Sequence, residues 1–274
     1  MKKTTYRKQR KKDWFKLKRY VHIGNQLEPR DRSWLTPSVP NTEALEKQLF
    51  YPFIHTTLQT KRYRRATKTD GTKSKMRVSS KKNRPLSYSN HIDAKVFSYY
   101  SEMLTKEYEK LIEELNFSEC VTAYRRIKLD KDRKKSRNKC NIDFANDIFE
   151  LIKKRRGEDL VAIAFDIESF FDNLDHKLLK QKWRQVIRSG LDLPKDHYNI
   201  YRNITHFSYI NEADLFNLFK DRLITQKLNK GTGEIISKKK RVERKRYFRK
   251  ENVVAYCDTI DIKKIRSKGI IKSN

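Results

Sequence analysis

The sequence predicts an α/β fold that is rich in helix and contains a small sheet. Apolar residues recur at helical spacing from Ile92 to Leu115, which predicts one long helix. The continuous apolar run Leu160–Phe165 is typical of a buried central strand. A second amphipathic stretch starts near Asp175 and carries Trp183 on its apolar face. These three stretches define the predicted fold class.

The N-terminal part of the chain is basic. Residues 1–35 are dotted with Trp and Tyr, and we expect an arm there that becomes ordered on RNA. The segment 41–58 is expected to begin as a helix with Thr42 as its N-cap. Residues 61–84 carry many cations around Asp70-Gly71, a typical turn pair, which predicts a basic loop or hairpin.

The remaining elements are expected in the following order. The first are a helix over 90–117, a short strand over Cys120–Ile127, a charged loop over Lys128–Lys139, and a helix over Asp143–Lys154 with Phe144, Ile148, Leu151 and Ile152 directed inward. After the strand Leu160–Phe165 come a helix from Asp175, partly helical structure over 198–228, a solvated hairpin or loop over 229–250, and a strand over Val253–Cys257.

Charge points to the class of partner. The 274 residues carry a formal net charge of +31, and a charge of that size destabilises a compact state unless a polyanion neutralises it. Nucleic acid is favoured over a membrane surface, because no run is long enough to span a bilayer and no basic amphipathic helix stands out. The N-terminus lacks the apolar core of a signal peptide, and the three cysteines lack zinc spacing. We therefore expect a cytoplasmic protein with reduced thiols and no membrane partner.

The strongest candidate for chemistry is the stretch from Phe165 to His176. An apolar strand that runs directly into Asp166 would hold a carboxylate rigidly at a strand end. Polymerases need such carboxylates to hold two Mg²⁺ ions, which bind hard oxygen ligands. The alternative is that these acids cap the following helix, and Asp172, Asn173 and Asp175 suit that role.

The sequence DIESFFDNLDHKLL, residues 166–179, resembles the first palm motif of bacterial reverse transcriptases, including the group II intron, retron and phage-defence types. The segments 84–93 and Ala123–Arg126 resemble the fingers of that family, and Leu193–Tyr198 is also similar to bacterial members. The similarity covers roughly residues 40 to 270. It implies a right-hand polymerase with a basic N-terminal arm over 1–40, fingers over 41–158, and a partial palm over 159–274 that carries a basic insertion near 229–250.

The resemblance also implies roles for single residues. Asp166 would be the first metal-binding carboxylate, and the backbone carbonyl of Ile167 would be a further ligand to Mg²⁺ or, in its place, Mn²⁺. Phe171 would be the aromatic gate under the sugar of the incoming dNTP. Arg84 and Lys82 would face the triphosphate or the template. Near this site, the residues expected to support the structure are Phe170, Asp172, Asp175 and His176, with ordinary core packing as the alternative for one of the two phenylalanines.

Two further motifs of the family are absent from the sequence. No Gln-Gly pair and no Asp-Asp pair occurs, although the family needs both for a complete active site. We therefore expect a truncated chain that is inactive by itself and that lacks a C-terminal half. In complete form it would bind an RNA template, an RNA/DNA duplex and dNTPs, and the lack of a visible maturase or endonuclease segment favours a role in anti-phage defence.

Two other classes of protein compete with this hypothesis. A non-catalytic RNA-binding protein could hold structured RNA through phosphate contacts and stacking on Tyr and Phe. It could act alone or complement a separately encoded half. A ribosomal-type basic protein would fit the charge, but such a protein has no need of a carboxylate at a strand end.

Overall fold

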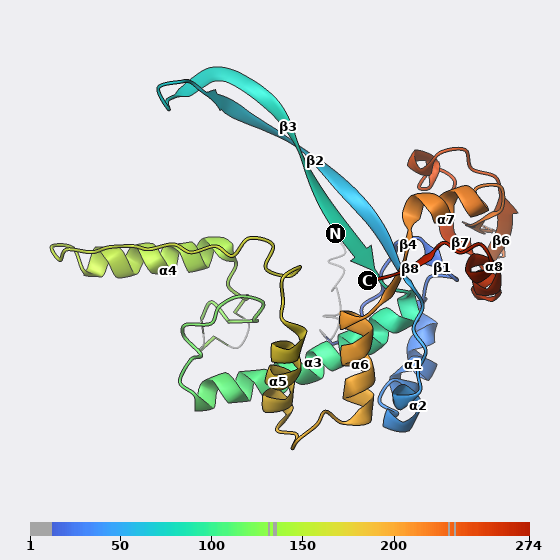
Figure 1. The fold of residues 1–274 in the computed structure, drawn as a ribbon, viewed down its shortest axis with the longest axis horizontal. Coiled ribbons are helices and arrows are strands. Elements are labelled where there is room, and N and C mark those ends of the chain that lie inside the picture. The colour runs from blue at the N-terminus through green and yellow to red at the C-terminus, as the bar shows by residue number, and fades with distance from the viewer. Residues whose placement is uncertain (1–12, 131, 134–135, 230, 233) are drawn as a thin grey trace, which may run out of the picture. The chain divides into compact units, whose positions relative to one another are not determined.

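The computed structural model describes residues 13–130, 132–133, 136–229, 231–232 and 234–274. These residues form eight α-helices and two mixed sheets of four strands each, so the predicted α/β class is confirmed (Figure 1). The chain divides into two compact units. The first unit combines the chain up to Glu102 with Leu193–Asn274, and the second unit is Met103–Asp192. This division falls at other places than the boundaries expected at residues 40 and 158.

The first unit contains both sheets. One sheet has the order β1-β7-β5-β6, and the other has the order β3-β2-β4-β8. The pairs β1–β7 and β2–β4 are parallel, and the remaining pairs are antiparallel. The strands are β1 (His22–Ile23), β2 (Phe53–Thr67), β3 (Lys73–Tyr88), β4 (Ser208–Asn211), β5 (Leu223–Leu228), β6 (Ile235–Lys240), β7 (Val253–Cys257) and β8 (Ile271–Ser273).

A row of isoleucines crosses the second of these sheets. Ile54 of β2 pairs with Ile210 of β4, which pairs in turn with Ile271 of β8. Ile54 and Ile210 are fully buried, and they belong to the same apolar cluster as Phe219 of α7 (Glu212–Phe219). Burial of the apolar side chains of this cluster is the main stabilising contribution to the unit.

The described part of the expected N-terminal arm packs into the first unit. Phe15, Ile23, Leu27 and Leu35 are buried, and Ile23 lies in the central apolar cluster. The expectation of an arm that becomes ordered only on RNA is therefore wrong from residue 13 onward. Residues 1–12 lie outside the described part of the chain.

The helix expected over 41–58 is short. It is α2 (Thr42–Glu46), and its N-cap is Asn41, whose side chain accepts a hydrogen bond from the Ala44 backbone at 3.0 Å, not Thr42. The Asn199 side-chain amide donates to the carbonyls of Leu45 and Gln48 at 2.7 and 3.0 Å. These bonds satisfy carbonyls at the end of the helix, after which the chain extends into β2. The other helices of this unit are α1 (Arg32–Ser38), α6 (Lys195–Thr205) and α8 (Ile262–Ser267), with short 3-10 turns at Pro29–Asp31, Lys245–Tyr247 and Thr259–Asp261.

The long predicted helix is confirmed as α3 (His91–Glu114). It ends where Asn116 adopts a left-handed conformation with φ of 57°, and the Phe117 backbone donates to the Ile112 carbonyl at 2.8 Å. This is a Schellman ending, and Asn tolerates the left-handed position better than most residues. None of the described helices is both long enough and apolar enough to cross a bilayer.

The second unit also contains α4 (Asn141–Lys154) and α5 (His176–Ile187), and its described part has little core. Its buried hydrophobic residues are Ile112 and Trp183. The helix expected over Asp143–Lys154 is confirmed, but its apolar face does not point inward. Ile148 and Leu151 are 57% and 52% exposed, because no described element of this unit covers that face.

The strand expected over Cys120–Ile127 is wrong, since this segment is formed of turns. The Arg125 side chain donates to the carbonyls of Ser118 and Val121 at 2.5 and 2.6 Å. It also forms a bidentate ion pair with Glu109 of α3, at 2.9 and 2.6 Å. The guanidinium thus ties these two carbonyls to α3, and this local hydrogen bonding competes with strand pairing and holds the segment as a loop.

Candidate nucleic-acid interface

β2 and β3 form a long β-hairpin (Figure 1), and this hairpin carries the clearest concentration of charge. Its base is anchored by the buried Ile54, and most residues beyond Thr57 are exposed. At its tip, the Asp70 side chain accepts from the Thr72 backbone at 2.8 Å, and Gly71 adopts a φ of +80°. Glycine populates that left-handed region readily, and the predicted hairpin with its Asp-Gly turn is confirmed.

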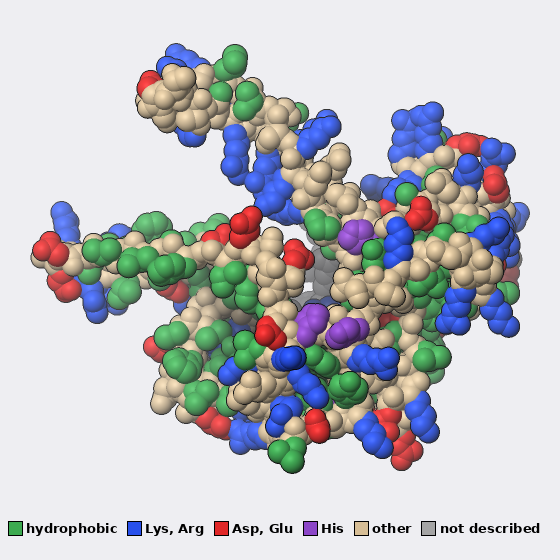
Figure 2. All heavy atoms as spheres, in the orientation of Figure 1, with side chains coloured by type: hydrophobic (Ala, Val, Ile, Leu, Met, Phe, Trp, Pro, Cys, Tyr) green, Lys and Arg blue, Asp and Glu red, His purple; other side chains and the backbone are tan. Residues whose placement is uncertain are grey.

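The hairpin contains eleven cations and a single acid, Asp70. Figure 2 shows Lys and Arg side chains gathered along its length. Within the described residues, none of these cations takes part in an ion pair with a carboxylate. The cations are Lys61, Arg62, Arg64, Arg65, Lys68, Lys73, Lys75, Arg77, Lys81, Lys82 and Arg84.

The register of the two strands places like charges directly opposite each other. Lys61 pairs with Lys81, and Arg65 pairs with Arg77. Directly opposed residues project to the same face of a hairpin, and residues two apart in a strand share that face. Tyr63 therefore lies between the two cationic pairs, and its side chain is 64% exposed. We name Lys61, Tyr63, Arg65, Arg77 and Lys81 the cationic face.

Lys82 and Arg84 lie on the opposite face of the same hairpin. Lys82 is opposite Thr60, and Arg84 is opposite Leu58. Both are exposed, and they share their face with Arg62 and Arg64. The two fingers residues singled out from the sequence therefore belong to a basic surface, but the four cations on the other face are arranged more symmetrically, as two directly opposed pairs. Lys61 and Lys81 are equally far from Gly71 in the sequence, and so are Arg65 and Arg77. This symmetry about the turn is the sequence signal that could have predicted the two opposed pairs.

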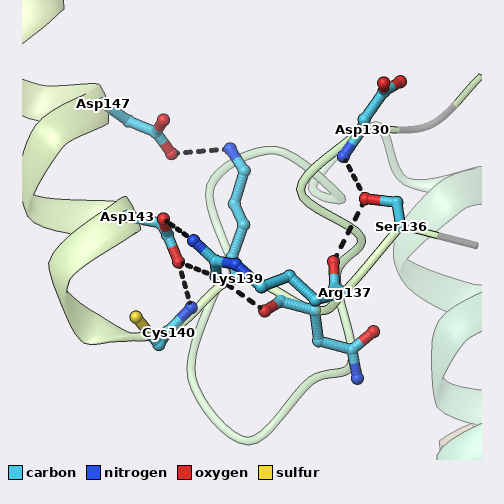
Figure 3. Close-up of polar contacts among 8 residues, drawn as sticks. Asp130, Ser136, Arg137, Lys139, Cys140, Asp143 and Asp147 are labelled. Atoms are coloured by element: carbon cyan, nitrogen blue, oxygen red, sulfur yellow. Dashed lines mark hydrogen bonds and ion pairs between the residues drawn. The ribbon is translucent and has the colours of Figure 1, made fainter. Parts of the chain in front are cut away.

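The charged loop before α4 differs from the hairpin, because acids of α4 hold two of its cations (Figure 3). Arg137 makes a bidentate ion pair with Asp143 at 2.6 and 2.7 Å, and Lys139 binds Asp147 at 2.7 Å. The Asp143 side chain also accepts from the Cys140 backbone, and the Arg137 guanidinium, followed by that backbone donor, holds the pKa of Asp143 well below its usual value. Arg137 and Lys139 are thus neutralised by acids of α4.

The segment that contains Asp166 is not the strand that its apolar run predicts. Residues 158–168 have no regular secondary structure, and Val161 and Phe165 are 86% and 90% exposed. A fully apolar strand is stable when neighbouring strands pair with both of its edges and other layers cover its faces. The described residues of the second unit provide no strand to pair with it, so the run stays extended and exposed. Asp166 is likewise exposed, and it is followed directly by Ile167.

The two aromatic residues after Asp166 lie in a turn. Phe170 and Phe171 are 46% and 66% exposed, so neither is a core residue. The ring of Phe171 meets the ring of Tyr124 edge to face, with centroids 6.2 Å apart. The turn is closed by the Asp172 backbone, which donates to the Ser169 carbonyl at 2.9 Å. These contacts hold the aromatic pair beside the loop of Tyr124.

The predicted helix after this turn is confirmed, and so is its cap. The Asp175 side chain accepts a hydrogen bond from the Leu178 backbone at 3.0 Å, and His176 is the first helical residue. This bond, with a second one from the Lys177 backbone, holds the pKa of Asp175 below its usual value. Capping is therefore the function of Asp175 in this structure, and Asp172 lies in the preceding turn.

The residues near Asp166 do not fit a two-metal site. Within the described part of the chain, no group of three or more His, Cys, Asp and Glu side chains lies close enough to hold a metal ion. Asp166 and the Ile167 carbonyl lie in the second unit, whereas Lys82 and Arg84 lie in the first. The predicted site residues are thus distributed over the two units, and no catalytic step follows from the structure.

Comparisons with known proteins add no family assignment. No protein-family model matches the chain, and no curated protein matches it either.

Proposed function

We propose that this chain is part of a reverse transcriptase, and that its own contribution is to hold RNA on the β2–β3 hairpin. One observation carries the RNA-binding part, namely the opposed pairs Lys61–Lys81 and Arg65–Arg77 on the cationic face. The resemblance of residues 166–179 to a palm motif carries the assignment to that family. The proposed ligand is an RNA template or an RNA/DNA duplex in the cytoplasm.

The physical argument rests on charge. Like charges directly opposite each other destabilise a hairpin, and no described carboxylate relieves the repulsion here. Phosphates that approach the cationic face would remove this repulsion and release condensed counterions. Tyr63 presents an exposed ring between the pairs, on which an unpaired base can stack. Cations and an aromatic ring on one strand face suit a nucleic acid better than they suit a lipid surface.

Catalysis is proposed only for a complete form of the protein. Addition of dNTPs needs carboxylates that hold two Mg²⁺ ions, with Mn²⁺ as a substitute, and the described residues offer Asp166 without such a group. The remaining acids would have to come from outside the described residues. We therefore expect this chain alone to bind RNA and not to extend a primer. Anti-phage defence remains our proposal for the biological role.

The test uses the full chain in two assays. RNA binding is followed by fluorescence anisotropy over a range of salt concentrations, and primer extension is assayed with dNTPs and Mg²⁺. We expect RNA affinity that falls steeply with salt, no extension, and equal RNA affinity for Asp166→Ala. Extension that Asp166→Ala abolishes would show that the chain is an active polymerase. RNA affinity that does not depend on salt would contradict the binding role.

A non-catalytic RNA-binding protein is the second candidate. The exposure of the whole segment around Asp166 favours it, because a catalytic carboxylate needs a rigid support. Hydrogen exchange at residues 158–168 separates the two candidates. Fast exchange that persists after RNA and dNTP are both added favours the non-catalytic protein. Slower exchange after the same addition favours the polymerase.

A further inference from the structure

A second basic surface lies on the sheet β1-β7-β5-β6, and acids hold four of its cations. Lys239 binds Asp258 at 3.0 Å, and Lys240 forms an ion pair with Glu251. Arg241 binds Asp221 and Glu243 at 3.2 and 2.7 Å, and Lys245 pairs with Glu212. These cations are already neutralised, so the Lys-rich run around β6 is a weak candidate for phosphate binding.

A groove beside this surface has a different character. It encloses about 690 Å³ between the segment before β1, the end of the β5–β6 hairpin, and the turn that leads into β7. Its exposed cations are Arg19, Lys227 and Arg249. Of these, Arg19 makes only a long hydrogen bond of 3.4 Å to the Leu27 carbonyl in the described structure, and neither arginine has an ion pair there.

The floor of the groove has an exposed apolar platform. Leu228 and Ile235 are cross-strand partners at the end of the β5–β6 hairpin, and they are 65% and 46% exposed. Phe248 lines the groove as well, and its ring is fixed against Tyr256 with centroids 5.7 Å apart. An apolar surface that stays exposed beside cations suits the flat face of a base.

Amide side chains complete the lining. Gln26 and Asn252 stand at its edge, and Asn252 adopts a left-handed φ of 50° in the tight turn before β7. An amide carries both donors and acceptors, which matches the edge of an unpaired base. Gln26 also donates to the Tyr20 carbonyl at 3.3 Å, so its side chain is held in place.

We propose that this groove is a second RNA-binding site, which takes single-stranded RNA with a base on the Leu228–Ile235 platform and the flanking phosphates at Arg19 and Arg249. The proposal rests on the proposed function for the class of polymer, but it concerns residues outside the β2–β3 hairpin. Cations alone would also suit an acidic peptide. The apolar platform and the amides favour RNA, because stacking and base-edge contacts have no counterpart in polyglutamate.

The test is photo-crosslinking of the full chain to oligouridylate that carries thiouridine, with crosslinked peptides mapped by mass spectrometry. We expect two separate sets of crosslinks, one on the peptide of Tyr63 and one on the peptides of Tyr20 and Phe248. In the variant Arg19→Gln/Arg249→Gln, the yield of groove crosslinks should fall roughly fivefold, and the yield at Tyr63 should stay the same. It should also lower the slope of log affinity against log salt by about 1.4, since each phosphate contact to single strands contributes about 0.7.

Arg202→Gln, at an exposed position of α6, is the control and should change neither set. Leu228→Glu repeats the test at an exposed position if the double variant does not fold. Crosslinks at Tyr63 alone would overturn the groove site and leave the hairpin proposal standing. Absence of both sets would overturn both proposals. Displacement of the groove crosslinks by polyglutamate, but not by the same concentration of an uncharged polymer, would assign the groove to an acidic peptide instead.

Discussion

Lys61 and Lys81 lie directly opposite each other in the β2–β3 ladder, and Arg65 and Arg77 repeat this arrangement nearer the tip. Two such pairs on one face cost folding stability, because like charges across a ladder repel. The same arrangement gives a row of positive charge along an exposed strand. Stability and RNA binding should therefore respond in opposite directions to changes at these positions.

The first prediction concerns Lys81→Glu. An acid opposite Lys61 replaces repulsion by attraction, so the free energy of unfolding should rise by about 0.2–1 kcal/mol. RNA affinity should fall at the same time, and the salt slope should decrease by about 1. Urea unfolding and anisotropy titrations measure the two effects. Lys263→Glu, at an exposed position of α8, makes the same change in net charge and should have a smaller effect on RNA affinity.

The second prediction concerns Tyr63. Its exposed ring lies between the two cationic pairs, where stacking of one base is worth about 1–3 kcal/mol. Tyr63→Ala should weaken binding of single-stranded RNA by about that amount and should affect duplex RNA less. Tyr63→Phe keeps the ring and should bind like the unchanged protein. Equal losses for Ala and Phe would show that the hydroxyl matters and that stacking does not.

The third prediction concerns the loop that follows α3. The Arg125 guanidinium, whose side chain is 8% exposed, joins Glu109 to the carbonyls of Ser118 and Val121. Arg125→Lys keeps the charge but cannot reproduce this set of planar donors. We expect a loss of about 2 kcal/mol, in the range of hydrogen bonds to charged groups, measured by urea unfolding. Arg126→Lys, next in the chain, is the control, and a similar loss there would refute the specific role of Arg125.

The fourth prediction concerns pH. Asp93, in the first turn of α3, is buried, and its Oδ2 accepts from the Tyr51 backbone at 2.9 Å while its Oδ1 has no partner among the described residues. Burial raises the pKa of Asp93 to about 7, against the lowering effect of the Tyr51 bond. The folded state therefore retains a proton that the unfolded chain, with a pKa of about 3.9, has lost. The contribution of Asp93 to stability should fall as pH rises from about 4 to about 7, on the order of 4 kcal/mol, and stay constant above that.

The measurement is the difference in unfolding free energy between the protein and Asp93→Asn at each pH. A difference is required because burial lowers the pKa of His91 to about 4, and that of His22 to about 3. The contribution of these two histidines to the stability of the protein decreases as pH falls, because the unfolded chain then binds protons that the folded state does not. This opposes the trend of Asp93 over the same pH range. A difference that does not change between pH 4 and pH 7 would contradict the raised pKa of Asp93.

Local signals in the sequence determined several elements of this protein. The apolar spacing from Ile92 to Leu115 defined α3, and Asp70-Gly71 defined the tip of the hairpin. Asp175 was among the predicted caps, and it caps α5. Helical periodicity, tight turns and N-caps depend on residues a few positions apart, so a short window of sequence contains the whole interaction.

Tertiary structure alone decided the fate of the apolar segments and the composition of the surfaces. Leu160–Phe165 is as apolar as a central strand, but a strand forms only with a partner, and the described residues of its unit provide none. Ile23 belongs to the core because β1 pairs with β7, which lies far away in the sequence. Arg19 and Arg249 meet in one groove for the same reason. Pairing between distant segments follows from the fold as a whole, and no local pattern of residues encodes it.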